Sequence, residues 1–165
     1  MTGTIIQISI SRGGVPKRAI AEGMITPLGI EGDGHAHPEI HGGPRQAILI
    51  ICAEVIDDLI FVRGYPLFYG ALGENLTIRG LNHREIRVGQ RYRAGQALLE
   101  ITKLRVPCNT IAVYGANIGN EIYDAQVKAG NPESPRWGMA GFYASVVRSG
   151  EVRQNDIIAL IDQAV

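Results

Sequence analysis

The sequence has few cysteines, no excess of charge and no long apolar segment. Among its 165 residues only Cys52 and Cys108 are cysteines, which is too few for a disulfide framework, so we expect both to be reduced thiols. The longest apolar run, AILIICA, is far shorter than the roughly 20 residues that cross a bilayer. Sixteen basic residues balance sixteen acidic ones, which leaves no global field to attract nucleic acid or an anionic membrane. Any anion site must therefore be built locally.

The opening segment is not expected to be a secretory leader. The opening segment MTGTIIQISISRGG has no basic stretch ahead of a long apolar core, and its polar and apolar residues alternate as in a strand. We therefore expect the first strand here and a cytoplasmic location. The length fits one domain, residues 1–165, which would bury about 70% of the surface that the unfolded chain exposes.

Short elements follow one another along the chain. QAILII predicts a strand covered on both faces, and CAEVIDDLIFVRG predicts a helix that ends at Gly64. Helical segments are also predicted from Asn109 and within residues 119–130, and SGEVRQND predicts a turn between two closing strands. Seven or eight short strands without a βαβ rhythm favour a mainly β fold, a closed or nearly closed β-barrel with a few short helices, because closure removes exposed strand edges.

Cys108, in RVPCNTIAVYG, is the first candidate for chemistry. A working cysteine needs positive potential to ionise near neutral pH, since the pKa of a free thiol is about 8.5. Arg105 lies three residues earlier, and a helix that begins at Asn109 would point its first amides at the sulfur. Pro107 fixes the backbone just before the thiol. By contrast, Cys52 ends an apolar strand and is expected to pack in the core.

The segment EGDGHAHPEIHGGPRQA is the second candidate. Its histidines, His35, His37 and His41, could ligate a metal, although Pro38 and the glycines make a regular strand unfavourable there. Alternatively, Gly42 and Gly43 let backbone amides approach a ligand, and Arg45 offers a fork for phosphate or carboxylate. Both interpretations stay open on the residues alone.

Four segments in order together resemble one known family. GIEGDGHAHPEIHGGPRQAI, GALGENLTIRGL, IRVGQRYRAGQALLEITKLRVPC and GFYASVVRSGEVRQNDIIAL are similar to the successive motifs of the MOSC domain, the module named after the C-terminal part of molybdenum cofactor sulfurase. The resemblance runs from about Lys17 to Leu160 and is to a stand-alone, bacterial-type member. It implies a β-barrel-like fold, molybdenum cofactor as ligand, and Cys108 as a cysteine that ligates molybdenum or carries a persulfide sulfur.

The same resemblance assigns roles to other residues. His41 and Asp33 join Cys108 as catalytic candidates, and Gly42 and Gly43 would line the pocket. The candidates for holding the cofactor by charge, by hydrogen bonds or by bracing the pocket are Lys17, Arg45, Glu74, Asn75, Arg105 and Asn109. Lys17, Arg45 and Arg105 are included for their chemistry more than for the motif.

Two positions depart from the family pattern. His37 stands where an acidic residue is usual, beside the expected site, and this puts the accepted substrate or cofactor form in question. Asn155 stands where glycine is usual before Asp156, and we expect a turn variant because asparagine tolerates the left-handed conformation.

Two functions of different classes follow. The first is a molybdenum-dependent reductase of N-hydroxylated small molecules, which needs a separate electron-donor protein because the chain has no flavin or dinucleotide motif and no cysteine set for an iron–sulfur cluster. The alternative is a carrier that holds the cofactor or a persulfide on Cys108 and exchanges sulfur with a partner sulfurtransferase. Neither requires nucleic acid or a membrane.

Overall fold

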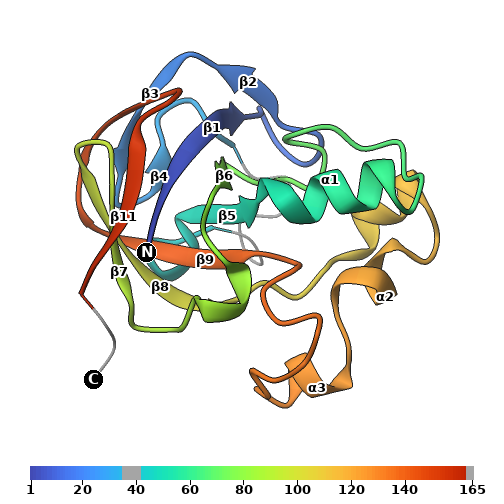
Figure 1. The fold of residues 1–165 in the computed structure, drawn as a ribbon. Coiled ribbons are helices and arrows are strands. Elements are labelled where there is room, and N and C mark those ends of the chain that lie inside the picture. Colours follow the sequence, from blue (N-terminus) through green and yellow to red (C-terminus); the bar gives the residue numbers. More distant parts are fainter. Residues whose placement is uncertain (35–41, 163–165) are drawn as a thin grey trace.

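The computed structural model describes residues 1–34 and 42–162 and contains two sheets (Figure 1). Its strands are β1 (Thr2–Ile10), β2 (Arg18–Ile20), β3 (Glu22–Thr26), β4 (Gly29–Ile30), β5 (Ile48–Cys52), β6 (Leu76–Arg79), β7 (Arg91–Ala94), β8 (Ala97–Leu104), β9 (Phe142–Arg148), β10 (Gly150–Arg153) and β11 (Ile157–Asp162). Its α-helices are α1 (Ala53–Phe61), α2 (Ile118–Ile122) and α3 (Ala125–Lys128), and its 3₁₀ helices are η1 (Pro44–Gln46), η2 (His83–Glu85) and η3 (Asn109–Tyr114).

The larger sheet closes into a barrel, which confirms the predicted fold class. Seven of its eight strands follow the order β11, β7, β8, β9, β5, β6, β1, and β1 pairs again with β11 to complete the ring. The eighth strand, β2, also pairs with β1. Neighbouring strands are antiparallel except β5 and β6, which are parallel. At the closure β1 approaches both β6 and β11, and a Cβ on Gly3 would lie 2.4 Å from the carbonyl oxygen of Arg79. Only glycine fits this crossing of strands.

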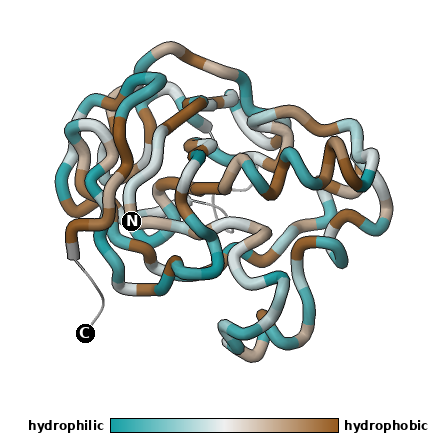
Figure 2. The backbone as a smooth tube through the Cα atoms, viewed as in Figure 1, coloured by the Kyte–Doolittle hydropathy of each residue, from teal (hydrophilic) through white to brown (hydrophobic). Residues whose placement is uncertain are grey.

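Strand β5 is buried along its whole length, as its apolar run predicts. Helix α1 follows it directly, and Val55, Ile56 and Leu59 point into the core. Brown and teal alternate along α1 in Figure 2, as expected of a helix with one face on the core and one in solvent. Cys52, at the junction of strand and helix, is only 2% exposed and packs in the core as predicted.

Two local predictions are wrong. Residues 150–153, predicted as part of a turn, form β10, which pairs with β3 in a small sheet of order β10, β3, β4. The helix expected within residues 119–130 is two helices, because Asp124 caps a new one by accepting a hydrogen bond from the Val127 amide at 2.8 Å. Asn155, in contrast, has a φ of 72° and confirms the predicted left-handed turn variant.

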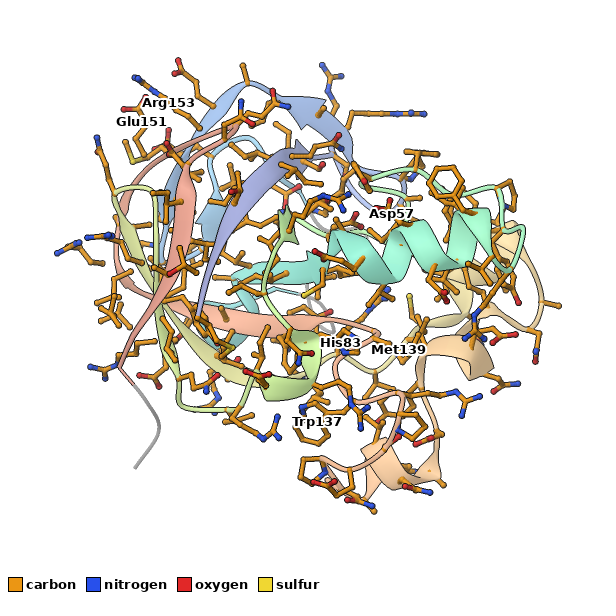
Figure 3. All side chains as sticks on the ribbon, viewed as in Figure 1. Asp57, His83, Trp137, Met139, Glu151 and Arg153 are labelled. Atoms are coloured by element: carbon orange, nitrogen blue, oxygen red, sulfur yellow. The ribbon has the colours of Figure 1, made fainter. Side chains whose placement is uncertain are left out.

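Trp137 belongs to the packing of the fold. Its side chain is 5% exposed, and Nε1 donates a hydrogen bond to the Ile86 carbonyl at 3.0 Å. The Arg87 guanidinium lies 5.2 Å from the ring centroid, and the Trp137 carbonyl contacts the His83 ring (Figure 3). No helix among the described residues is long and apolar enough to cross a membrane.

Candidate functional site

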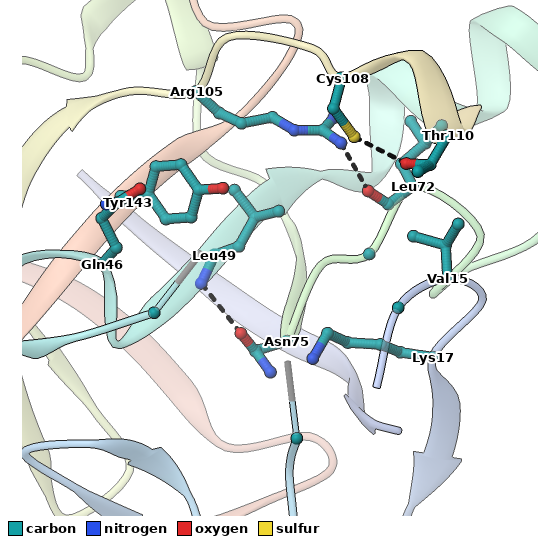
Figure 4. Close-up of a pocket in the computed structure, with 14 residues that line it drawn as sticks. Val15, Lys17, Gln46, Leu49, Leu72, Asn75, Arg105, Cys108, Thr110 and Tyr143 are labelled. Carbon is teal, nitrogen blue, oxygen red and sulfur yellow. Dashed lines mark hydrogen bonds between the residues drawn. The ribbon is translucent and has the colours of Figure 1, made fainter. Parts of the chain in front are cut away.

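Cys108 lies at a pocket where distant parts of the chain meet (Figure 4). The pocket has a volume of about 90 Å³. Its lining comes from the turn after β1, the segments before β5 and β6, and the segment that joins β8 to η3. The lining residues are Gly14, Val15, Lys17, Gly34, Gly42, Gln46, Leu49, Leu72, Gly73, Asn75, Arg105, Cys108, Thr110 and Tyr143.

The Cys108 thiol is half-buried and hydrogen-bonded. It sits at the N-cap of η3, and its Sγ lies 2.7 Å from the Thr110 hydroxyl oxygen. Burial alone would raise the pKa of this thiol, but the Thr110 hydroxyl, the Thr110 backbone N–H and the positive charge of Arg105 together outweigh burial and lower it. The predicted activation of Cys108 is thus supported by Arg105, while Thr110 and a short 3₁₀ turn replace the expected helix.

Arg105 is a buried cation, and one of its donors is not engaged by any described residue. Arg105 is 4% exposed, and its Nη2 donates a hydrogen bond to the Leu72 carbonyl at 2.9 Å. Nη1 is buried without a hydrogen-bond partner among residues 1–34 and 42–162. A buried charged donor left unpaired is costly, so this atom suits an anionic or oxygen-rich ligand in the pocket.

Glu74 and Asn75 lie behind and beside this pocket. Glu74 is fully buried, and its Oε1 accepts hydrogen bonds from the Gly70 amide at 2.6 Å and the Thr77 hydroxyl at 3.1 Å. Burial raises the pKa of Glu74 despite these hydrogen bonds and the charge of Arg105. Asn75 lines the pocket and accepts a hydrogen bond from the Leu49 amide at 3.1 Å. Their contacts are those of bracing residues.

Lys17 and Asp33 form a buried ion pair at the pocket wall. Lys17 Nζ lies 2.5 Å from both carboxylate oxygens of Asp33. Asp33 also accepts hydrogen bonds from the Ser11 amide at 2.9 Å and from Asn75 Nδ2 at 2.8 Å. Both oxygens are therefore engaged, and the contacts hold the wall in place. The catalytic role of Asp33 stays a prediction.

The other predicted residues are distributed more widely. Gly42 lines the pocket, whereas Gly43 is the N-cap of η1 and has open space beside it. Arg45 is exposed on η1, and the structure does not bring it to the pocket lining. Asn109 lines a neighbouring cleft instead. His41, like His35 and His37, lies outside the described residues.

Several lining residues escaped the sequence analysis as site residues. Thr110 follows Cys108 by two positions, and its spacing alone could have suggested a hydrogen bond to the thiol. Tyr143 and Gln46 carried no local signal, because an alternating strand and a short loop look the same whether or not they border a pocket. Closure of the barrel brings them to Cys108.

Comparison with known proteins finds similarity along most of the chain. The MOSC domain model matches residues 37–159. Protein YiiM of Escherichia coli is 32% identical over 145 residues, covering 85% of this chain and 59% of YiiM. The uncharacterized protein YflK of Bacillus subtilis is 30% identical over 151 residues, covering 91% of this chain and 64% of YflK. The chain thus spans about three fifths of the length of these curated relatives.

Solved structures share the fold. YiiM from Geobacillus stearothermophilus superposes with a TM-score of 0.72 at 22% identity, covering 97% of this chain and 75% of that one. The YuaD protein from Bacillus subtilis gives a TM-score of 0.70 at 19% identity, covering 96% and 94%. At these identities the likeness extends to the fold alone.

Proposed function

Because the chain belongs to the MOSC domain family, which is associated with molybdenum cofactor binding, we propose that it is a molybdenum-cofactor-dependent reductase of N-hydroxylated compounds. In this proposal Cys108 is the protein ligand of the metal. The observation that carries it is the pairing, in one pocket, of a thiol whose pKa is lowered with a buried guanidinium whose Nη1 has no hydrogen-bond partner among the described residues.

The residues present fit such a group. A thiolate is a soft ligand suited to a transition metal, and Cys108 supplies one. Anionic oxygens of the cofactor would find Nη1 of Arg105, which no described residue engages, and the ammonium group of Lys17, which they would share with Asp33. The pocket volume of about 90 Å³ matches a single charged group, so these residues would hold the part of the cofactor nearest Cys108.

The chain's own residues set the conditions for the reaction. The bound cofactor would supply two-electron oxygen-atom chemistry. Thr110 and Arg105 lower the pKa of Cys108 and so favour its thiolate form, and the pair of Lys17 and Asp33 fixes the wall beside it. His41, outside the described residues, would position the substrate or supply a proton.

The overall change balances only with an outside reductant. The N–O bond of a hydroxylamino group breaks, two electrons and two protons are taken up, and an amine and water are released. The sequence carries no flavin or dinucleotide motif, so the electrons would come from a separate electron-donor reductase.

One observation favours a second candidate, a carrier of sulfur or cofactor. Cys108 is half-buried and borders a second cleft as well as the pocket, so two openings meet at this residue. A carrier needs this access, because the Cys108 thiolate would attack the outer sulfur of a persulfide on the sulfurtransferase. The S–S bond of that donor breaks, its thiol leaves, and Cys108 holds the transferred sulfur as a persulfide.

Cofactor content tests the proposal directly. We would produce the wild type, Cys108→Ala and Cys52→Ala in a host that makes molybdenum cofactor, and measure bound molybdenum and oxidised-pterin fluorescence. We expect near-stoichiometric cofactor in the wild type and in Cys52→Ala, whose substituted thiol lies in the core, and a loss of at least about tenfold in Cys108→Ala.

The opposite results have distinct meanings. Equal cofactor in Cys108→Ala would show that Cys108 is not the ligand. Absence of cofactor in all three folded proteins, together with persulfide trapped on Cys108 after incubation with a sulfurtransferase, would replace the reductase by the carrier.

A further inference from the structure

Two buried charged side chains at the pocket each keep one atom that no described residue engages. Glu74 is 0% exposed and Arg105 is 4% exposed. Oε2 of Glu74 and Nη1 of Arg105 have no hydrogen-bond partner within residues 1–34 and 42–162. Buried polar atoms are nearly always paired, so an unpaired acceptor and an unpaired donor at one pocket require an explanation. We propose that the pocket binds a small oxyanion, and that it does so only when Glu74 is protonated.

Glu74 and Arg105 act on the same turn of the chain. Oε1 of Glu74 accepts a hydrogen bond from the Gly70 amide at 2.6 Å, and Nη2 of Arg105 donates one to the Leu72 carbonyl at 2.9 Å. The charge of Arg105 also reaches the Glu74 carboxyl. Arg105 lines the pocket, and Figure 4 shows its side chain extending toward Cys108. A ligand would therefore contact Arg105 directly and would experience Glu74 through it.

The charges at the pocket cancel when Glu74 is ionised. Lys17, in the lining, is neutralised by Asp33, because its Nζ contacts both carboxylate oxygens at 2.5 Å. Arg105 could offer a surplus positive charge, but an ionised Glu74 would cancel it. An oxyanion that entered such a neutral pocket would lose hydration without compensation. With Glu74 protonated, one buried positive charge remains and its Nη1 can donate to the anion.

The surroundings of Glu74 favour the protonated carboxyl. Burial raises the pKa of Glu74 and outweighs the Gly70 and Thr77 hydrogen bonds and the charge of Arg105, which lower it. A bound anion would offset the charge of Arg105 and favour protonation further. Tyr114 of η3 also lies within electrostatic reach of Glu74, but burial raises the pKa of this phenol, so it stays neutral near neutral pH.

The size of the pocket limits the ligand to a small oxyanion. A volume of about 90 Å³ corresponds to roughly three water molecules. Val15, Leu49 and Leu72 make part of the lining apolar, so the charged contacts of the anion would come mainly from Arg105. Sulfate is a suitable probe because, unlike phosphate, it does not titrate in the range where Glu74 is expected to do so. The proposal holds for either candidate function, since it concerns the charge balance of the pocket.

Sulfate binding to the cofactor-free protein tests the proposal. An ionised Cys108 would also repel the anion, so every protein carries Cys108→Ser. We would measure sulfate affinity by calorimetry, at constant ionic strength and from about pH 5 to about pH 9, for this background and for its combinations with Glu74→Gln, Arg105→Met and Glu133→Gln. Glu133 is exposed on the loop after α3 and lies outside the pocket lining, so its neutral isostere is the matched control.

The affinity of the background should fall as the pH rises. Below the pKa of Glu74 in the empty protein the carboxyl is already protonated, so the affinity is constant. Above it, binding draws a proton from solvent, and the affinity falls by up to about tenfold per pH unit. Glu74→Gln should keep the low-pH affinity at every pH, and Glu133→Gln should follow the background. Arg105→Met should bind sulfate at least about tenfold more weakly at low pH, because the charged donor is gone.

Two further readouts identify Glu74 as the group that takes up the proton. Calorimetry in buffers of different ionisation enthalpy counts protons, and uptake by the background should approach one per sulfate where the affinity falls and vanish in Glu74→Gln. Infrared spectroscopy detects the carbonyl band of a buried protonated carboxyl. This band should grow when sulfate binds in the same pH range, and Glu74→Gln should lack it.

Several results would overturn the proposal. They are absence of sulfate binding by the background, equal binding by Arg105→Met, and the same pH dependence in Glu74→Gln as in the background. If Glu74→Gln does not fold, the background decides alone, because a fall in affinity without proton uptake, or without the protonated carboxyl band, contradicts the proposal. All of these proteins are free of cofactor, so the outcome is independent of the cofactor-content test of Cys108.

Discussion

At the scale of single residues, Cys108 depends on close neighbours for its reactivity. Burial and hydrogen bonding oppose each other at this thiol, and the hydrogen bonds of Thr110 with the charge of Arg105 prevail. Cys52 shows the other outcome, since burial and the charge of Glu54 raise the pKa of its thiol to about 12. The two cysteines therefore differ in chemistry because of their surroundings, and only Cys108 is suited to act as a thiolate.

Thr110 provides a test of this account. In Thr110→Val the hydroxyl is lost with little change in shape, so the pKa of Cys108 should rise and less thiolate should exist at neutral pH. We expect alkylation by iodoacetamide at neutral pH to slow by roughly threefold to tenfold, and the pH at which the rate climbs to move upward. The measurement is a rate profile against pH on cofactor-free protein.

Cys108→Ala supplies the blank for that profile, because the buried Cys52 should not react. If Thr110→Val and the wild type gave superimposable profiles, the hydroxyl would have no part in activating the thiol.

At the scale of elements, the sequence identified those whose pattern is long. The continuous apolar run of β5 and the buried face of α1 were predicted correctly, but the helix ends at Phe61, three residues before the predicted stop at Gly64. Strand β10 was missed because only Val152 of its four residues is buried, so its alternation is too short to distinguish from a turn. The division between α2 and α3 depends on the cap at Asp124, which interrupts an otherwise helical pattern.

Asn155 shapes the turn between β10 and β11, so a prediction about this turn belongs to the scale of elements. Its φ of 72° is costly for residues with a Cβ, and asparagine is among the few that tolerate it. We expect Asn155→Ala to lower the free energy of unfolding by about 1 kcal/mol, and Asn155→Gly to match or exceed the wild type. Thermal unfolding of the three proteins measures this, and an alanine variant as stable as the glycine variant would contradict it.

At the scale of the whole molecule, the closed barrel decides which candidates meet. The sequence singled out Cys108, Arg105 and Lys17, and closure brings all three to one pocket. It also placed Arg45 in the same set, yet that residue lies exposed on η1. The prediction failed because neighbouring glycines do not show in which direction a short helical turn will face. Residues such as Tyr143 become part of the site only through pairing between strands distant in sequence.

The buried ion pair of Lys17 and Asp33 is expected to contribute to the stability of the fold. It joins the segment after β1 to the segment after β4, and the side chains are 8% and 2% exposed. Asp33→Asn would leave the Lys17 ammonium buried without its counter-charge, so we expect a loss of about 3 to 5 kcal/mol in the free energy of unfolding. The double variant Lys17→Met/Asp33→Asn removes that unpaired charge and should recover most of the loss. Urea unfolding of the wild type, both single variants and the double variant gives the coupling between the two residues.

An exposed ion pair of the same barrel is the control. Arg79 and Asp57 contact each other at 2.7 Å, but their side chains are 44% and 26% exposed, so solvent screens the pair and Arg79→Gln should cost much less than Asp33→Asn. Comparable losses for the two variants would mean that Lys17 and Asp33 behave as a surface pair. A double variant no more stable than Asp33→Asn would likewise refute the unpaired charge as the cause. The expected recovery, in contrast, would identify the buried pair as the clamp that holds the wall of the Cys108 pocket.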